Sequence, residues 1–282
     1  MISLGENQYG KSRVRLVQVK RRPEGHDFRE WTVEILFRGD FASCFTDGDN
    51  SKILPTDTMK NTVYSLARDS SAASMECFAK ELIDFFLERN SQISSAEITV
   101  SGKSWEHIAV GGESHPTAFV QSSGELQTAK VTRAQGGRFA VVSGLRNLVI
   151  MKTADSAFEG YIRDSLTTLP EASDRLFGTA VEANWKYTSA DLNFLTLREK
   201  IRETLLTAFA GHASKSVQHT MYAMGEAVLE KFAEVDEIEF TMPNIHCLLV
   251  DLSRFGQTNP NEIFVPTDEP HGTIQACIRR KP

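Results

Sequence analysis

The chain has 282 residues and a net charge of −6, from 31 Lys and Arg against 37 Asp and Glu. A general nucleic-acid binder is disfavoured, because such a protein needs a surplus of Lys and Arg to displace phosphate counterions. The four cysteines include no Cys-x-x-Cys pair, so neither a disulfide framework nor a structural metal site is indicated.

The first half begins with alternating apolar and polar residues at 13–20 and 31–37, which predict a long β-hairpin. Thr56 and Asp57 are expected at a helix N-terminus, because either side chain can accept amide hydrogens of the first turn. Residues 74–89 carry apolar side chains at helical spacing, which is typical of a helix packed on a sheet. Two further strands are expected, at residues 97–100 and 105–110.

Residues 111–137 are rich in Gly, Ser, Thr and Gln without a strong period, which indicates a surface hairpin and an interdomain link. The second half then repeats the order strand, strand, helices, strand, strand. Its strands are expected at 138–143, 148–153, 180–187, 238–242 and 247–252, and its helices at 195–210 and 216–232. Hairpins with helices on one face define an α+β class, since tight connections cannot join parallel neighbours.

A short phrase occurs in both halves, as Asn61-Thr62-Val63-Tyr64 and as His219-Thr220-Met221-Tyr222. This repeat predicts a duplicated fold. The residues that precede the phrase differ, with Pro55-Thr56-Asp57 in one half and Ser216-Val217-Gln218 in the other. Unlike polar residues at equivalent places of a duplicated scaffold suggest one site built from both halves. Unpaired sheet edges are commonly closed by association, so an oligomer is expected.

The chain contains no stretch of ~18 uninterrupted apolar residues, and Met1 to Lys11 is polar rather than a signal sequence. It ends in Arg279-Arg280-Lys281-Pro282, not in the Ser-Lys-Leu that directs proteins to peroxisomes. We therefore expect a cytoplasmic protein of bacterial type, with no membrane and no nucleic acid among its partners.

Seven groups of residues, in order along nearly the whole chain, together resemble the urate oxidase (uricase) family. Taken singly, each residue has a more ordinary structural role, so the prediction depends on their joint order. The groups are Tyr9-Gly10-Lys11, Thr56-Asp57 with Lys60-Asn61-Thr62-Val63-Tyr64, Ser156-Ala157-Phe158-Glu159-Gly160, Arg163-Asp164-Ser165-Leu166-Thr167-Thr168-Leu169, Asp174-Arg175, Ser216-Val217-Gln218 and Pro243-Asn244-Ile245-His246.

This resemblance implies two tandem tunnelling-fold (T-fold) domains, which we place at residues 1–136 and 137–282. In that fold antiparallel sheets carry helices on the outer face, pairs of chains close a barrel, and two barrels stack into a homotetramer around a central tunnel. The implied reaction oxidises urate with dioxygen to 5-hydroxyisourate and hydrogen peroxide. The resemblance implies no metal, no organic cofactor, and active sites at subunit interfaces.

Three predicted site residues suit a flat, anionic purine. Arg175 offers paired donors at a fixed angle, Gln218 can both donate and accept, and Phe158 can stack on the ring. The resemblance adds the backbone of Val217 and of Asp57, and the N–H of Thr56, as further contacts with the ring edges.

The predicted chemistry requires proton transfer, because ground-state oxygen reacts slowly with closed-shell molecules unless they become strong electron donors. Lys11 beside Thr56 is expected to act as the proton-handling pair, with the lysine as base through the hydroxyl. Asn244 is expected to hold dioxygen, and later peroxide or water, over the ring. His246, on the same strand face as Asn244, is expected to pass protons to the pair, whereas the remaining histidines are expected to be structural or surface residues.

Two alternatives stay open. Another tunnelling-fold enzyme that acts on purines or pterins would share the architecture, but those enzymes hold zinc in Cys and His clusters that this sequence lacks. A catalytically silent assembly protein would keep the tetramer alone, although it gives no reason for Lys11 and Thr56 beside a full ring-binding set.

Overall fold

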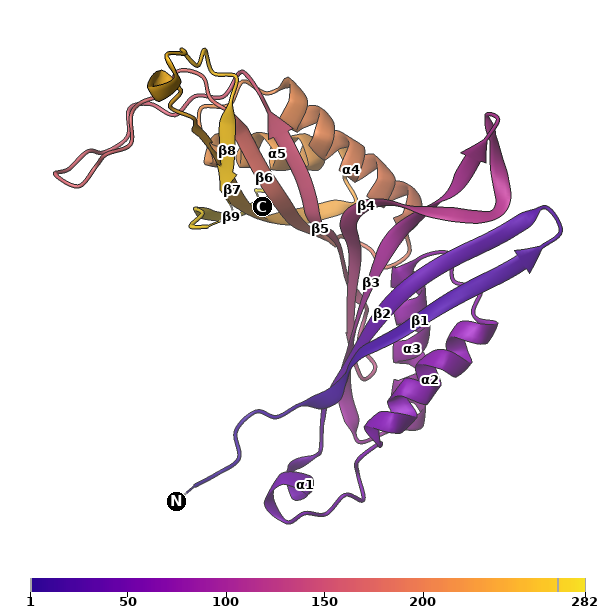
Figure 1. Ribbon diagram of the computed structural model, residues 1–282. Coiled ribbons are helices and arrows are strands. Elements are labelled where there is room, and N and C mark those ends of the chain that lie inside the picture. The colour runs from indigo at the N-terminus through magenta and orange to yellow at the C-terminus, as the bar shows by residue number, and fades with distance from the viewer. Residues whose placement is uncertain (1, 268, 282) are drawn as a thin grey trace. The chain divides into compact units, whose positions relative to one another are not determined.

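The computed structural model describes residues 2–267 and 269–281. It divides the chain into two compact units, of which unit 1 comprises Met1–Gly144 and Lys186–Arg198, and unit 2 comprises Leu145–Trp185 and Glu199–Pro282. Each unit pairs antiparallel strands with helices on one face of its sheet, so the predicted α+β class is confirmed (Figure 1). No helix in the described part of the chain is long and apolar enough to cross a membrane.

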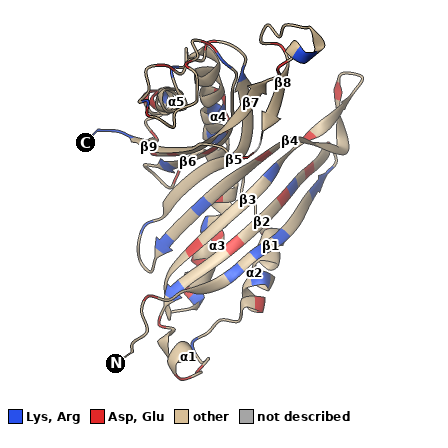
Figure 2. Cartoon of the chain, turned by 60° about the vertical axis from the view of Figure 1, so that its left-hand side comes forward, with Lys and Arg blue, Asp and Glu red and all other residues tan. Residues whose placement is uncertain are grey.

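Unit 1 is a meander of four long strands, paired in chain order, with two helices packed against them. The alternation seen in the sequence buries the inward side chains of β2, including Val33, Ile35 and Phe37, against the helices. Its elements are β1 (Tyr9–Arg22), β2 (Gly25–Gly39), α1 (Ala42–Thr46), α2 (Thr56–Asp69), α3 (Met75–Arg89), β3 (Ile93–Val110) and β4 (Glu113–Ala134). Figure 2 shows Lys and Arg interspersed with Asp and Glu along β1 to β3.

The two helices of unit 1 begin where the sequence predicts, but only one of them has the expected cap. Ser74 precedes α3, and its hydroxyl accepts the amide hydrogen of Cys77 at 3.3 Å. Helix α2 begins at Thr56, yet Pro55 is the cap residue and no side chain caps this end. The expected capping by Thr56 or Asp57 is therefore wrong. Both residues lie inside the first turn, which leaves their side chains available for other contacts.

Strand β4 is the main departure from the sequence prediction in unit 1. The expected hairpin turn is present at Gly111 and Gly112, which both have positive φ, but residues 113–134 form one strand rather than a link. The strand pairs with β3 along its length, and its few buried side chains lie mainly in its second half, such as Ala129 and Val131. Because the outer half is exposed on both faces, it lacks the apolar alternation that marks a strand. The two strands expected at 97–100 and 105–110 are likewise the single strand β3.

Unit 2 has the same kind of layering, with helices on one face of its sheet. Its elements are β5 (Ala140–Lys152), β6 (Phe177–Tyr187), α4 (Phe194–Gly211), α5 (Val217–Lys231), β7 (Val235–Leu249), η1 (Ser253–Phe255), β8 (Phe264–Thr267) and β9 (Thr273–Arg279), and the chain passes between the units within β5, β6 and α4. Strand β7 pairs with both β8 and β9. The pairs of strands expected at 138–153 and 238–252 are single strands, and β8 and β9 were not predicted.

A buried ion pair lies inside unit 1. The Glu76 side chain is completely buried, and its carboxylate accepts hydrogen bonds from the Arg198 guanidinium and the Ser143 hydroxyl. Arg198 is 4% exposed and also donates to the backbone carbonyls of Gly144, at 2.7 Å, and Thr128, at 3.0 Å. This network joins α3 to residues far away in the sequence, so its loss would lower the stability of the whole unit.

Candidate functional site

Lys11 and Thr56, the predicted proton-handling pair, are held by segments that Tyr9 joins. The Tyr9 hydroxyl donates to the carbonyl of Leu54 at 3.3 Å and accepts from the amide of Leu54 at 2.9 Å. This fixes the start of β1 against the segment that leads into α2. Gly10 is required between Tyr9 and Lys11, because a Cβ there would lie 1.8 Å from the carbonyl oxygen of Ile35.

Charges converge at the first turn of α2. The Asp57 carboxylate accepts hydrogen bonds from the Lys60 ammonium and from the Asn61 amide, the latter at 3.0 Å. The hydrogen bond and charge of Lys60, and more weakly the charge of Lys11, hold the pKa of Asp57 below its ordinary value. Lys11 therefore lies within electrostatic reach of the first turn of α2.

In unit 2, Phe158 and Arg175 are held together by a short backbone ladder. Phe158 exchanges two hydrogen bonds with Ala172, at 2.8 and 3.2 Å, and the amide of Arg175 donates to the carbonyl of Ser156 at 2.8 Å. The Asp174 carboxylate accepts the amide hydrogen of Ser156 at 3.0 Å, which closes the ladder. As a result the Arg175 guanidinium lies 5.1 Å from the centre of the Phe158 ring.

The Arg175 side chain is half-buried, and this burial lowers the pKa of its guanidinium. Its Nε atom is buried and has no hydrogen-bond partner among the residues that the structure describes. A buried donor without a partner is costly, typically about 1–3 kcal/mol, so a ligand that accepts from this atom would gain from satisfying it.

A cavity of about 400 Å³ in unit 2 brings together four of the predicted residues, Phe158, Arg175, Asn244 and His246. The last two lie on the same face of β7, where the side-chain amide of Asn244 is 3.5 Å from His246 Nδ1. Apolar side chains complete the wall, namely Leu169, Leu176, Leu248, Leu249 and Phe264. A concave, mostly apolar lining with a few polar groups is typical of a small-molecule site.

Val217 and Gln218 begin helix α5 and do not line this cavity. Val217 is 4% exposed, whereas Gln218 is exposed. The segment before them is nonetheless tied to the segment that carries Phe158, because Ala157 donates its amide hydrogen to the carbonyl of Ser214 at 2.8 Å. Unit 1 thus gathers Lys11, Thr56 and Asp57, while unit 2 gathers Phe158, Arg175, Asn244 and His246 around its cavity.

Comparison with known proteins identifies the family of this chain. The uricase family model matches residues 7–132 and 141–275. The chain is 41% identical to the uricase of Arthrobacter globiformis over 280 residues, which are 99% of this chain and 91% of that protein. It is 35% identical to the uricase of Dictyostelium discoideum over 282 residues, 99% of this chain and 98% of that one. The chain belongs to the uricase family.

Solved structures agree with this assignment. The crystal structure of the Arthrobacter globiformis uricase superposes with a TM-score of 0.94 at 40% identity, covering 100% of this chain and 96% of that one. A urate oxidase from Bacillus sp. TB-90 superposes with a TM-score of 0.85 at 25% identity, covering 97% and 100%. All predicted site residues, from Lys11 to His246, fall within the two ranges that the family model matches.

Sequence reasoning missed Tyr161 as a neighbour of the site. Its ring stacks on that of Phe158 at 4.9 Å between centroids and 14° between planes, and its hydroxyl donates to the carbonyl of Leu169. The only available signal was its position, three residues after Phe158. Tyr161 supports one face of the Phe158 ring, which restricts the ring's orientation.

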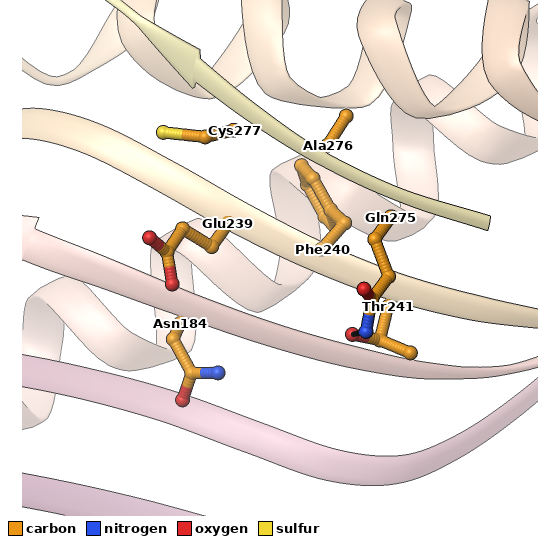
Figure 3. A pocket seen from close by; sticks show the side chains of 7 residues that line it. All are labelled: Asn184, Glu239, Phe240, Thr241, Gln275, Ala276 and Cys277. Atoms are coloured by element: carbon orange, nitrogen blue, oxygen red, sulfur yellow. Dashed lines mark hydrogen bonds between the residues drawn. The ribbon is translucent and has the colours of Figure 1, made fainter. Parts of the chain in front are cut away.

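A second hollow in unit 2, of about 350 Å³, contains none of the predicted residues (Figure 3). It is polar and lies over β6, β7 and β9, where the Gln275 amide donates to the Thr241 hydroxyl at 3.1 Å and Glu239 lies near Asn184. Within the described ranges, no group of three or more His, Cys, Asp and Glu side chains is placed to hold a metal ion.

Proposed function

We propose that this protein is a urate oxidase, which converts urate, dioxygen and water to 5-hydroxyisourate and hydrogen peroxide. The observation that carries the proposal is the paired placement of Arg175 and Phe158 at the cavity, in a chain of the uricase family. Two electrons leave the urate ring for oxygen, and the hydroxyl group of the product comes from water.

In the proposed complex, urate lies against the Phe158 ring. The Arg175 guanidinium donates to adjacent acceptors on one ring edge, and its unpartnered Nε gains the hydrogen bond that it lacks within the described protein. Gln218 and the backbone of Val217 bind the other edge, together with the backbone of Asp57 and the amide of Thr56. Base stacking on an aromatic side chain contributes about 1–3 kcal/mol in comparable sites.

Proton removal is assigned to Lys11 and Thr56. The lysine takes a proton from the substrate through the threonine hydroxyl, which makes the urate ring a strong electron donor to oxygen. Asn244 holds oxygen, and later peroxide or water, above the ring, and His246 returns protons to the pair. The contact between Asn244 and His246 supports this division of roles.

The proposed assembly is a homotetramer whose active sites combine residues of two chains. This follows from the family's tunnelling fold and agrees with the division of the predicted residues, some gathered in unit 1 and the others in unit 2. A cytoplasmic location and a reaction without metal or organic cofactor are part of the same proposal.

Purified protein, dialysed against a chelator, is expected to consume urate in air and to release peroxide. Loss of the urate absorbance band and a coupled peroxidase assay measure the two sides of the reaction. Inactivity under these conditions, with restoration by an added metal, would contradict the cofactor-free mechanism. Inactivity of a well-assembled tetramer with or without metals would instead support the silent assembly protein.

Arg175→Lys is expected to raise the KM for urate strongly, by about tenfold or more, because a lysine point charge cannot reproduce two parallel N–H donors. Steady-state kinetics of the purified variant test this. Arg146→Lys is a matched control, since Arg146 lies in the same unit, is more than half exposed and pairs with Glu182 at 3.1 Å. A KM for Arg175→Lys close to that of the control would count against bidentate recognition of the ring.

A further inference from the structure

Two histidines close the connection between helices α4 and α5. His212 directly follows α4, and His219 lies in the first turn of α5. His212 Nε2 is 3.1 Å from His219 Nδ1, and the rings meet edge to face, with their centroids 4.3 Å apart at 64°. The amide of Lys215 also points at His219 Nδ1, at 3.3 Å. The contact is therefore an N–H···N hydrogen bond that ties the two ends of the connection together.

This connection contacts the two segments of unit 2 that carry proposed urate contacts outside β7, namely the segment of Phe158 and the start of α5. On one side, the backbone amide of Ser214 donates to the carbonyl of Asp155, and its carbonyl accepts from the amide of Ala157, both at 2.8 Å. Ala157 directly precedes Phe158. On the other side, the Ser216 hydroxyl accepts the amide hydrogen of His219 at 3.1 Å and caps α5. Val217 and Gln218 lie between that cap and His219. The histidine pair thus lies where the two sets of proposed ring contacts join.

We propose that His212 and His219 are positioning residues for urate, whose mutual hydrogen bond fixes Val217 and Gln218 relative to Phe158. The inference rests on the proposed urate oxidase function. Neither imidazole lines the cavity, so each acts through the backbone of the connection. Without the pair, this connection keeps its hydrogen bonds to residues 155 and 157 but loses the side-chain contact that joins the end of α4 to the first turn of α5.

The same contact makes urate affinity sensitive to acid. An N–H···N hydrogen bond needs one ring nitrogen with a lone pair, and when both rings are protonated all four nitrogens are donors. The charges that act on His212 are positive, namely His219 and the Lys152 ammonium of β5, which donates to the His212 carbonyl. Burial, then the charges of His219 and Lys152, lowers the pKa of His212. The pair therefore persists near neutral pH and separates only in more acidic solution.

Two substitutions at His219 separate positioning from mere packing. His219→Phe keeps a ring but removes both nitrogens, whereas His219→Asn places a carbonyl oxygen near the position of Nδ1 and does not titrate. At pH 8 we expect His219→Phe to raise the KM for urate about fivefold, the usual effect of one lost hydrogen bond, with kcat within about twofold of the wild type. His219→Asn should restore the wild-type KM. Urate binding under argon, where no turnover occurs, gives the affinity directly.

The pH experiment compares the ratio of the urate affinities of variant and wild type at each pH, because protonation of urate itself affects every variant equally. Lowering the pH from 8 to values below ~6.5, the ordinary histidine pKa, should weaken urate binding more in the wild type than in His219→Asn, because His212 is protonated only in that more acidic range. His115→Phe, on the exposed β3–β4 hairpin, is the control and should follow the wild type.

The outcomes are distinguishable. If the wild type neither binds nor oxidises urate, the proposed function fails. If the wild type is active and His219→Phe binds urate as tightly as the wild type, the positioning role is wrong. Should His219→Phe fail to fold, as judged by its melting curve, the pH dependence of urate affinity in the wild type and in His219→Asn tests the inference instead. Identical pH responses of His219→Asn and the wild type would then overturn the inference.

Discussion

Replacing Lys11 by alanine is expected to lower kcat for urate oxidation by about 10²–10⁴, the usual contribution of one positioned acid–base group. Thr56→Ala should have an effect of the same order, because the lysine acts on the substrate through this hydroxyl. Affinity for urate under argon should change much less than kcat, since neither side chain supplies the main ring contacts. Stopped-flow or steady-state assays, together with anaerobic binding, separate the two quantities.

Lys20→Ala is the matched control for this experiment. Lys20 lies on the same strand, and its ammonium donates to the carbonyl of Ser70 at 2.6 Å, away from the candidate site. Its removal should leave kcat near the wild-type value. A loss confined to affinity in Lys11→Ala, with kcat intact, would contradict the role of Lys11 in proton transfer.

A mixing experiment extends this test to the shared site. Lys11→Ala and Arg175→Ala subunits are each expected to be inactive alone. Co-refolded mixtures should regain part of the activity if one chain supplies Lys11 and the other Arg175. No recovery in verified mixed oligomers would place the whole site within one chain.

Removal of Arg198 is expected to give the largest loss of stability, because it leaves the Glu76 carboxylate buried inside unit 1 without its charged partner. Glu76 is completely buried, and its Oε2 atom already lacks a hydrogen-bond partner among the described residues. Breaking a buried ion pair by deleting one partner typically costs about 3–5 kcal/mol, since the remaining charge stays desolvated. Arg198→Met should therefore lower the free energy of unfolding by about that amount, as measured by urea denaturation and by melting temperature.

Two companion variants test the cause. Glu76→Leu combined with Arg198→Met removes both charges, and it should recover much of the lost stability because no unpaired charge remains. Arg15→Met disrupts the surface pair with Glu30, in which the Arg15 side chain is 69% exposed, and should cost less than about 1 kcal/mol. A double variant no more stable than Arg198→Met alone would show that packing around Arg198, rather than charge, carries the effect.

Much of the fold was readable from short-range patterns. The alternation at 13–20 and 31–37 predicts the β1–β2 hairpin, and Ser74 and Ser216 stand where α3 and α5 are capped. These features depend on spacing within one element, so a local stretch of sequence is enough to specify them. Family membership likewise follows from residues spread along the whole chain, which lie in the ranges that the uricase family model matches.

Other features depend on partners far away in the chain. Residues 113–134 look like a link, yet they form β4 because β3 supplies their hydrogen bonds. The Glu76–Arg198 pair joins residues 122 positions apart, and the stacking of Tyr161 on Phe158 depends on the backbone ladder to Ala172. No local pattern encodes such contacts, because their free energy arises only when the packed fold removes water from both partners. The amino-acid order thus specified the helices, the hairpin, the family and the candidate residues, whereas the packed chain specified the long pairings, the cavity and the surroundings of its charged groups.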